Sequence, residues 1–272
     1  MSDFDLIAVD MDGTLLNDKL EITKKNKDKL NELAKKDIYI TLATARTFNS
    51  AFYYARKLGL DIPIITYNGA LIKEIKNNKI IYSNSINLDL AKNIIILGKK
   101  NNIYTKIYVD EMLLVREDNE EAKKFSKNHR IKYEVMKDIE NELSVSPYMI
   151  VFKDSIDNIK FIKKRLSEKF SKYISYTQSH PNSLEVMNKG VSKKTALKFL
   201  ANKLNIDNSK ILAIGNSEND FEMLKWSGLG IAMKNSDQSL LDKWNQISEY
   251  NNNESGVFYI LNKYINVSSN SK

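Results

Sequence analysis

The chain has 272 residues, a formal net charge of +8, two histidines and no cysteine. The absence of cysteine excludes disulfides, thiolate metal sites and cysteine nucleophiles, and two histidines are too few for a multi-histidine metal site. A metal would therefore need oxygen ligands, which favour a hard ion such as Mg²⁺. Because 42% of the residues are hydrophobic, we expect a globular chain, long enough for one large domain or two smaller ones.

The positive charge does not by itself indicate a nucleic-acid partner, because lysines are scattered among asparagines and acids, as in EIKNNKII and GKKNNIY. No apolar run approaches the roughly 20 residues that a membrane span needs. The acidic start MSDFD leads straight into the first apolar run, which argues against a signal peptide. We therefore expect a cytoplasmic protein, a monomer or weak homodimer, without nucleic-acid or membrane partners.

Short apolar runs alternate with helical patterns in the first and last parts of the chain. In order they are the strand LIAV, a helix over 22–36, IYITLAT, the helical FNSAFYYARKLGL and IPIITYNGA, then the helical KTALKFLANKLNI, ILAIG, ENDFEMLKWSGLG and GIAM. Unbroken apolar strands that alternate with helices are typical of a parallel sheet covered on both faces. The sequence predicts an α/β fold with a Rossmann-like, doubly wound parallel sheet.

The middle of the chain has a different pattern. A hairpin is expected in IYTKIYVDEMLLVRE, and helices are expected over 88–100 and 158–170. This pattern predicts an inserted α+β domain, an antiparallel sheet with helices on one face. We therefore divide the chain into a core, 1–83 and 187–272, and an inserted domain, 84–186.

Polar side chains follow four of the predicted core strands. They are Asp10 and Asp12 after the first, Thr44-Ala45-Arg46 after the second, Asn68-Gly69 after the third and 216–220 after ILAIG. Because ligands of open α/β sheets bind outside the carboxyl ends of the strands, these residues predict one site. Asp10 and Asp12 would repel each other unless a cation lies between them or one is protonated. The alternative for DGT is an Asx-turn or a helix N-cap.

Four motifs, DMDGTL, TLATAR, GVSKKTAL and GNSENDFEML, occur in this order and nearly span the chain. Together they resemble the haloacid-dehalogenase-like (HAD) phosphatases, and in particular the Cof-type branch, whose cap domain is inserted between the second and third motifs. The resemblance implies that 84–186 is the cap. It also implies that Asp10 is a nucleophile forming an aspartyl-phosphate, and that Asp12 protonates the leaving alkoxide and later deprotonates the water.

The resemblance assigns further residues to the phosphate and to the metal. The implied phosphate contacts are the main-chain N–H of Met11, the Thr44 hydroxyl, the N–H of Ala45, Lys193 and Asn219, and the implied Mg²⁺ ligands are Asp10, Asp12, Asn216 and Asp220. Asp220 could instead orient Lys193. Thr44 could be an ordinary helix N-cap. Lys193 could be a solvated surface lysine, and Lys194 is its competitor.

Two residues depart from the family pattern. Members often carry glycine where this chain has Ala45, which we expect to alter fit more than catalysis. Members commonly carry an aspartate where this chain has Asn216. An asparagine carbonyl can still bind Mg²⁺, but the site loses one negative charge, so metal affinity should fall or Asp220 should take a larger share.

Substrate selection is expected in the cap and at the end of the third strand. The candidate contacts are Asn68, Gly69, His180 and Glu185, the last to a sugar hydroxyl. His129, in a lysine-rich loop, is expected at the surface.

The resemblance implies an Mg²⁺-dependent phosphatase of small phosphorylated metabolites, such as sugar phosphates, FMN or pyridoxal phosphate. Two alternatives stay open. A phosphomannomutase-like transferase would need phosphate-binding arginines in the cap, where Arg116, Arg130 and Arg165 are few and scattered. A catalytically weakened regulatory protein that binds a phosphometabolite would explain Asn216.

Overall fold

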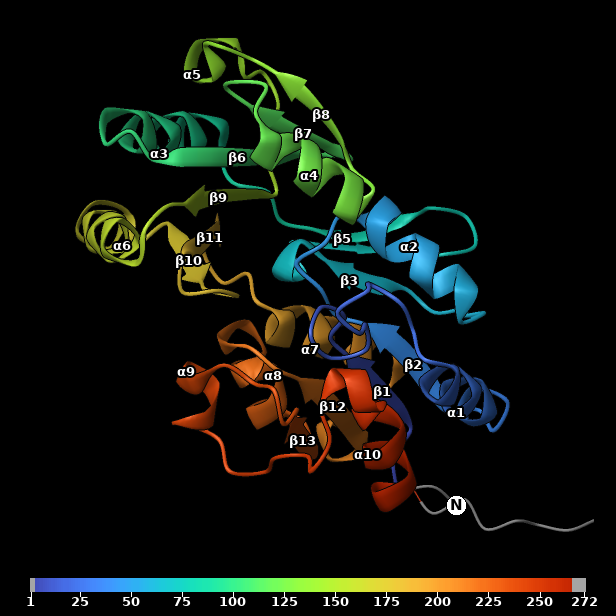
Figure 1. Cartoon of the computed structure of the whole chain (residues 1–272). Coiled ribbons are helices and arrows are strands. Elements are labelled where there is room, and N and C mark those ends of the chain that lie inside the picture. Colours follow the sequence, from blue (N-terminus) through green and yellow to red (C-terminus); the bar gives the residue numbers. More distant parts are fainter. Residues whose placement is uncertain (1–2, 266–272) are drawn as a thin grey trace, which may run out of the picture.

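The computed structural model describes residues 3–265, which form two parts joined by two linkers (Figure 1). The first and last parts of the sequence make the core. The middle of the sequence makes the cap, which lies over one edge of the core sheet.

Four parallel strands form the core sheet: β1 (Leu6–Val9), β2 (Tyr39–Leu42), β12 (Ile211–Gly215) and β13 (Leu229–Ala232). Their order is β13-β12-β1-β2. Successive residues of β1 alternate between two hydrophobic clusters, with Ile7 and Val9 on one face and Leu6 and Ala8 on the other. Both faces are buried, which confirms the predicted doubly wound sheet and explains why these strands are apolar throughout.

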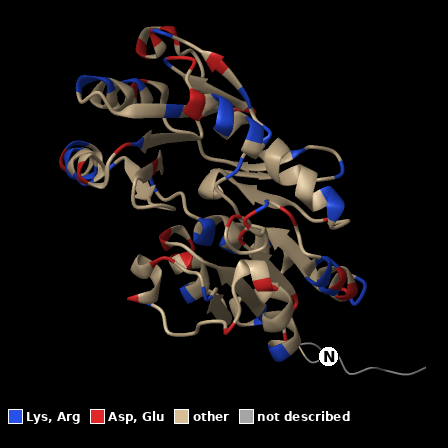
Figure 2. Cartoon of the chain, in the orientation of Figure 1, with Lys and Arg blue, Asp and Glu red and all other residues tan. Residues whose placement is uncertain are grey.

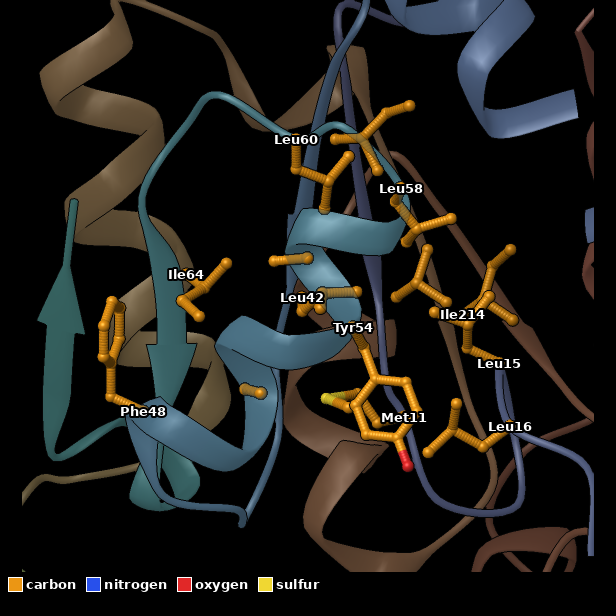
Figure 3. Close-up of a cluster of buried hydrophobic side chains, with 14 of the residues drawn as sticks. Met11, Leu15, Leu16, Leu42, Phe48, Tyr54, Leu58, Leu60, Ile64 and Ile214 are labelled. Carbon is orange, nitrogen blue, oxygen red and sulfur yellow. The ribbon is translucent and has the colours of Figure 1, made fainter. Parts of the chain in front are cut away.

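Helices cover both faces of this sheet. On the face of Ile7 and Val9 lie α1 (Lys24–Ala34), α2 (Phe48–Lys57) and α10 (Gly256–Tyr264), and on the other lie α7 (Lys193–Leu204) and α8 (Phe221–Trp226). Figure 3 shows the first face, where Met11, Tyr54 and Ile214 come together. This packing fixes the carboxyl ends of β1, β2 and β12 relative to one another.

The third predicted strand, β3 (Ile64–Thr66), joins β2 through a single parallel bridge. The chain then turns back into two antiparallel strands that the sequence did not predict, β4 (Leu71–Lys73) and β5 (Ile80–Ser83). The reversal lies in the 3₁₀ turn η1 (Tyr67–Gly69), whose residues have φ angles of 51°, 54° and 101°. Hydrophobic periodicity does not indicate three consecutive residues with positive φ, so the sequence pattern did not predict this reversal.

The cap contains a six-stranded sheet of order β10-β11-β9-β6-β7-β8. Its strands are β6 (Tyr104–Val109), β7 (Met112–Val115), β8 (Lys132–Val135), β9 (Met149–Lys153), β10 (Ile174–Thr177) and β11 (Ser183–Asn188), antiparallel except for β7 with β8. One face is covered by α3 (Leu88–Lys100) and α6 (Ile156–Phe170). Unlike the expected arrangement, α4 (Glu120–His129) lies on the opposite face, toward the core, because its Phe125 packs against Tyr108.

The two linkers between core and cap lie side by side, with Asn188 Nδ2 donating to Asn84 Oδ1 at 2.6 Å. Strand β11 stays in the cap sheet up to Asn188, past the predicted boundary at residue 186. A further contact joins the two parts away from the linkers, since the Tyr67 hydroxyl donates to the Asp110 carbonyl in the β6–β7 turn. The cap is therefore tied to the core away from the linkers as well as at them.

Short helices complete the described chain: α5 (Ile139–Glu142), η2 (Asn208–Lys210), η3 (Glu218–Asp220), α9 (Gln238–Leu241) and η4 (Asn252–Glu254). In residues 3–265 no helix combines the length and the apolar character that crossing a bilayer requires. Figure 2 shows basic and acidic residues interspersed on both core and cap.

Gly69 combines a positive φ with a close approach to the backbone of another segment. Its φ is 101°, and a Cβ there would overlap the Ser192 carbonyl. Gly69→Ala should therefore lower the free energy of unfolding by about 3 kcal/mol or more, from backbone strain and overlap together. Gly59 also has a positive φ, 62°, but open space around its Cβ position, so Gly59→Ala should cost only about 1–2 kcal/mol. Urea denaturation measures both, and equal losses would contradict the close contact with Ser192.

Candidate active site

The carboxyl ends of β1, β2 and β12 meet at one edge of the core sheet, where a cavity of about 470 Å³ opens between core and cap. The predicted residues that line it are Asp10, Asp12, Thr44, Ala45, His180, Glu185, Asn216 and Asn219. The others, Met11, Asn68, Gly69, Lys193 and Asp220, are buried next to this lining. Residues from distant segments of the chain, most of them at the predicted strand ends, thus lie together at one place.

A buried lysine joins two carboxylates beside the cavity. Lys193 begins α7 and places Nζ 2.6 Å from Asp10 Oδ1 and 2.7 Å from Asp220 Oδ1. Burial raises the pKa of Asp10 to about 7, although Lys193 opposes this change. Burial alone would lower the pKa of Lys193, but the two carboxylates raise it, so the ammonium stays charged. Lys193 is therefore not a surface lysine, whereas Lys194 is partly exposed and 3.8 Å from Glu222.

Both carboxylate oxygens of Asp220 are already engaged. Oδ1 accepts from Lys193, and Oδ2 accepts from the main-chain N–H groups of Asn216 at 2.9 Å and Ser217 at 3.0 Å. A Cβ on Gly215 would overlap the Asp220 carboxyl, so this close approach needs a glycine at the end of β12. These contacts favour one of the two predicted roles of Asp220. They fit a residue that positions Lys193 better than a ligand of the metal.

Arg46 belongs to a predicted strand end, but the sequence assigned it no role, and the structure pairs it with Asp12. Its Nε donates to Asp12 Oδ2 at 2.7 Å and its Nη2 donates to Asp12 Oδ1 at 2.6 Å, while Nη1 donates to Ser50 Oγ at 3.0 Å. Burial would raise the pKa of Asp12, but the hydrogen bonds and charge of Arg46 lower it below the usual value. The sequence signal for this pairing was the position of Arg46, directly after the strand that neighbours β1.

The loop after β2 presents Thr44 and Ala45 to the cavity. Thr44 Oγ1 accepts a hydrogen bond from the Arg46 N–H at 3.1 Å. The N-cap of α2 is Thr47, so the alternative N-cap role of Thr44 is wrong. Met11 buries its side chain in the core, which leaves only its main chain for the site (Figure 3).

Asn216 lies where oxygen atoms converge. One terminal atom of its amide is 3.1 Å from Asp10 Oδ2, 2.9 Å from the Asp12 main-chain oxygen and 2.9 Å from Thr14 Oγ1. If this atom is the nitrogen, it donates to all three oxygens. If it is the oxygen, it faces the Asp10 and Asp12 oxygens at distances that require a cation.

The second arrangement fits Mg²⁺. Neighbouring ligands of an octahedral ion with bonds of about 2.1 Å lie about 3 Å apart, and the Asn216 amide atom lies 3.1 Å from Asp10 Oδ2 and 2.9 Å from the Asp12 main-chain oxygen. Within residues 3–265 no group of three or more His, Cys, Asp and Glu side chains is placed to hold a metal. A metal here would therefore depend on one carboxylate, one main-chain carbonyl and one amide, with water completing its shell.

Asn219 and Asn68 form a second polar pair. Asn219 Nδ2 donates to Asn68 Oδ1 at 3.0 Å, and Asn68 Nδ2 lies 3.7 Å from Met149 Sδ. In the described part of the chain Asn219 Oδ1 is buried without a hydrogen-bond partner. Asn68 thus lies behind Asn219, and Gly69 packs against the start of α7 instead of facing the cavity.

The cap contributes Glu185 and His180 to the cavity wall. Glu185 is buried, and its carboxylate accepts from the Ser179 N–H at 3.1 Å, Ser179 Oγ at 2.5 Å and Ser183 Oγ at 3.1 Å. Burial raises the pKa of Glu185 despite these hydrogen bonds. His180 is exposed at the rim.

His129 is not at the outer surface, so that expectation is wrong. It is the last residue of α4, lines the cavity and stacks on Phe125 with ring centres 3.9 Å apart. Burial, together with the charge of Arg46, lowers the pKa of His129 to about 4, which makes it neutral at pH 7. His129 was expected at the surface, but α4 packs on the core-facing side of the cap and therefore places His129 in the cavity wall.

A doubly wound sheet, an inserted cap and paired acids after β1 define the class of HAD-like hydrolases. A family model described as haloacid dehalogenase-like hydrolase matches residues 7–261, and the chain belongs to this family. The motifs place it in the Cof-type branch, and it is a phosphatase of that family.

Individual relatives cover nearly the whole chain. YcsE of Bacillus subtilis (strain 168), a 5-amino-6-(5-phospho-D-ribitylamino)uracil phosphatase, is 28% identical over 263 residues, which are 97% of this chain and 96% of YcsE. The crystal structure of TM0651 from Thermotoga maritima is 29% identical and covers 98% of both chains, with a TM-score of 0.81. A haloacid dehalogenase-like hydrolase from Bacteroides thetaiotaomicron covers 96% of this chain and 99% of its own with a TM-score of 0.84, and at 22% identity shows the fold alone.

Lys193→Met would leave Asp10 and Asp220 buried without their shared cation. We expect the free energy of unfolding at pH 7 to fall by about 3–5 kcal/mol, as when one partner of a buried ion pair is removed. Lys194→Met removes the partly exposed neighbour and should change it by about 0.5 kcal/mol or less. Urea unfolding of the two variants is the measurement, and similar small losses in both would contradict a buried ionic cluster.

Proposed function

We propose that this phosphatase hydrolyses small phosphorylated metabolites through an aspartyl-phosphate on Asp10, with Mg²⁺ as cofactor. The observation that carries the proposal is the Asp10 carboxylate, held by Lys193 at the end of β1 and next to a second carboxylate, Asp12, in the cavity. A carboxylate in a fixed position can attack phosphorus, and the nearby cation offsets the charge of the phosphoryl group.

In the first step an Asp10 oxygen bonds to phosphorus while the ester P–O bond breaks, and Asp12 gives its proton to the leaving alkoxide. In the second step Asp12 takes a proton from a water that attacks phosphorus and frees the Asp10 carboxylate. Arg46 holds Asp12 in the anionic form, which suits the second step. The first step needs protonated Asp12, so the Asp12 carboxyl must turn from Arg46 toward the leaving oxygen.

The remaining residues position the phosphoryl group. The proposed donors are the Thr44 hydroxyl, the main-chain N–H groups of Met11 and Ala45, and the Asn219 amide. The Asp10 carboxylate, the Asp12 main-chain oxygen and the Asn216 amide oxygen would hold Mg²⁺. When bound, Mg²⁺ supplies positive charge next to the transferring group.

The cavity wall suits a leaving group with hydroxyl groups. Glu185 is a buried acceptor in the cap part of the cavity wall. YcsE carries the name of a phosphatase for a phosphorylated ribitylamino compound. Sugar phosphates are therefore the first proposed substrates, with FMN and pyridoxal phosphate as further candidates, in a cytoplasmic monomer or weak homodimer.

Two alternative functions have less support. A mutase-like transferase would need arginines of the cap to bind a second phosphate. Among the described residues, those that line the cavity do not include Arg116, Arg130 or Arg165. A regulatory protein that only binds a phosphometabolite would not need the buried pair of Asp10 and Lys193, whose removal from water is costly.

Asp10→Asn should abolish phosphate release, because an amide of the same shape is not a nucleophile here. The assay uses p-nitrophenyl phosphate and a panel of sugar and cofactor phosphates, each with and without Mg²⁺, and circular dichroism checks the fold. Full turnover by Asp10→Asn would overturn the mechanism. Folded wild-type protein that releases no phosphate from any of these esters would favour the regulatory alternative.

Asn216→Asp should lower the Mg²⁺ concentration needed for the half-maximal rate by about tenfold, about 1.4 kcal/mol for one added charge near the ion. Calorimetric titration with Mg²⁺ provides a readout that needs no turnover. Asn182→Asp adds the same charge to the cap side of the cavity and should leave this concentration unchanged. No shift in Asn216→Asp would mean that residue 216 does not contact the ion.

A further inference from the structure

One buried lysine of the cap faces the cavity without a counterion. Along β6, Tyr104, Lys106 and Tyr108 lie on the side toward the core, as alternate residues of a strand do. Lys106 is only 4% exposed and lines the cavity. Within the described residues its ammonium makes no ion pair or hydrogen bond, and it lies 3.7 Å from the centre of the Phe125 ring.

The acids nearest to Lys106 are bound by other residues. Glu121 on α4 pairs with Lys153 on β9, with Oε1 and Nζ 2.6 Å apart. Glu185 on β11 accepts three hydrogen bonds from serines. Removing an ammonium from water is costly, and a cation–π contact offsets only part of that cost. The structure therefore holds a buried positive charge that an anionic ligand would neutralise.

The strand register places this cation in line with a buried acceptor. Lys106 pairs with Val151, and Val151 pairs with Glu185, so the three residues form one row across the cap sheet. Neighbouring strands lie about 4.8 Å apart, so the Cα atoms of Lys106 and Glu185 are about 10 Å apart. The apolar side chain of Val151 lies between them. A leaving group that lies along this row would meet a cation at one end and a hydroxyl acceptor at the other.

Resting on the phosphatase function proposed above, we propose that Lys106 binds a second anionic group, a carboxylate or a phosphate, on the leaving group of the substrate. The preferred substrates are then monoesters with a negative charge away from the phosphate that is cleaved. Lys106 acts as a specificity residue, because it lies in the cap wall and not among the residues around Asp10. A neutral sugar phosphate is a poorer substrate because it leaves the buried ammonium uncompensated.

The charge of Lys106 gives this selectivity a pH dependence. Burial lowers the pKa of Lys106 to about 8, with Glu121 and Glu185 opposing the change and Lys153 adding to it. His129, the other titratable group facing it from α4, stays neutral above pH 5 because its pKa is about 4. Below pH 8 the ammonium is charged and attracts the second anion. The preference should therefore be greatest near pH 7 and decline as the pH rises through 8.

The test compares esters that differ in one group. 6-Phosphogluconate and sorbitol 6-phosphate differ only in a carboxylate against a hydroxymethyl group, and fructose 1,6-bisphosphate and fructose 6-phosphate test a second phosphate. Wild-type kcat/KM should favour the anionic member of at least one pair by about tenfold or more. Lys106→Met and Lys106→Gln should reduce this ratio to about one. Lys160→Met removes an exposed lysine from the outer helix α6 and should keep the wild-type ratio.

Calorimetric binding of the same pairs to Asp10→Asn protein separates this inference from the proposed function. Esters that turn over without an anionic preference, or a preference that survives in both Lys106 variants or is unchanged at pH 9, would overturn the role of Lys106 and leave the phosphatase standing. A Lys106-dependent binding preference in folded protein without any turnover would support the anion site and count against the phosphatase.

Discussion

The ammonium of Lys193, buried between Asp10 and Asp220, is the contact on which the rest of the site depends. Its partners come from three distant segments: the end of β1, the start of α7 and the turn after β12. Each of these charges would be uncompensated in the core without the others. The three segments must therefore take fixed relative positions, and Gly69 and Gly215 provide the space for them to approach.

Two acids at the tip of one buried strand are tolerated because each has its own cation and a different environment. Asp10 faces Lys193 deep in the core, where burial raises its pKa to about 7. Asp12 faces the guanidinium of Arg46, which lowers its pKa. Environments that separate the pKa values of two neighbouring carboxyls are a means of giving them different chemical tasks. The spacing D-x-D sets the positions of the two carboxyls, and the burial of Asp10 together with Arg46 beside Asp12 sets the difference in their pKa values.

The core sheet and most of the site could be predicted from the sequence, because unbroken apolar strands and their polar ends are local features. The pairing of Arg46 with Asp12 and the burial of Lys106 could not be predicted, since in a chain with 42 lysines and arginines these cations differ from the others only in burial and partners. The position of His129 depended on which face of the cap α4 covers, and no local pattern specifies that. The reversal at η1 (Tyr67–Gly69) depends on backbone conformation and close packing against Ser192. The chemical roles of Asp10 and the other site residues stay predictions.

The sheet order has a consequence for how the chain assembles. The central strand β1 lies between β2 and β12, and β12 begins only at Ile211. On the ribosome β1 emerges before the cap, and one of its edges stays unpaired while the whole cap is synthesised. The cap is continuous in sequence and can close its own sheet in that interval. Among the core strand pairs, β1 with β12 has the longest loop to close, and we therefore expect this pairing to form last.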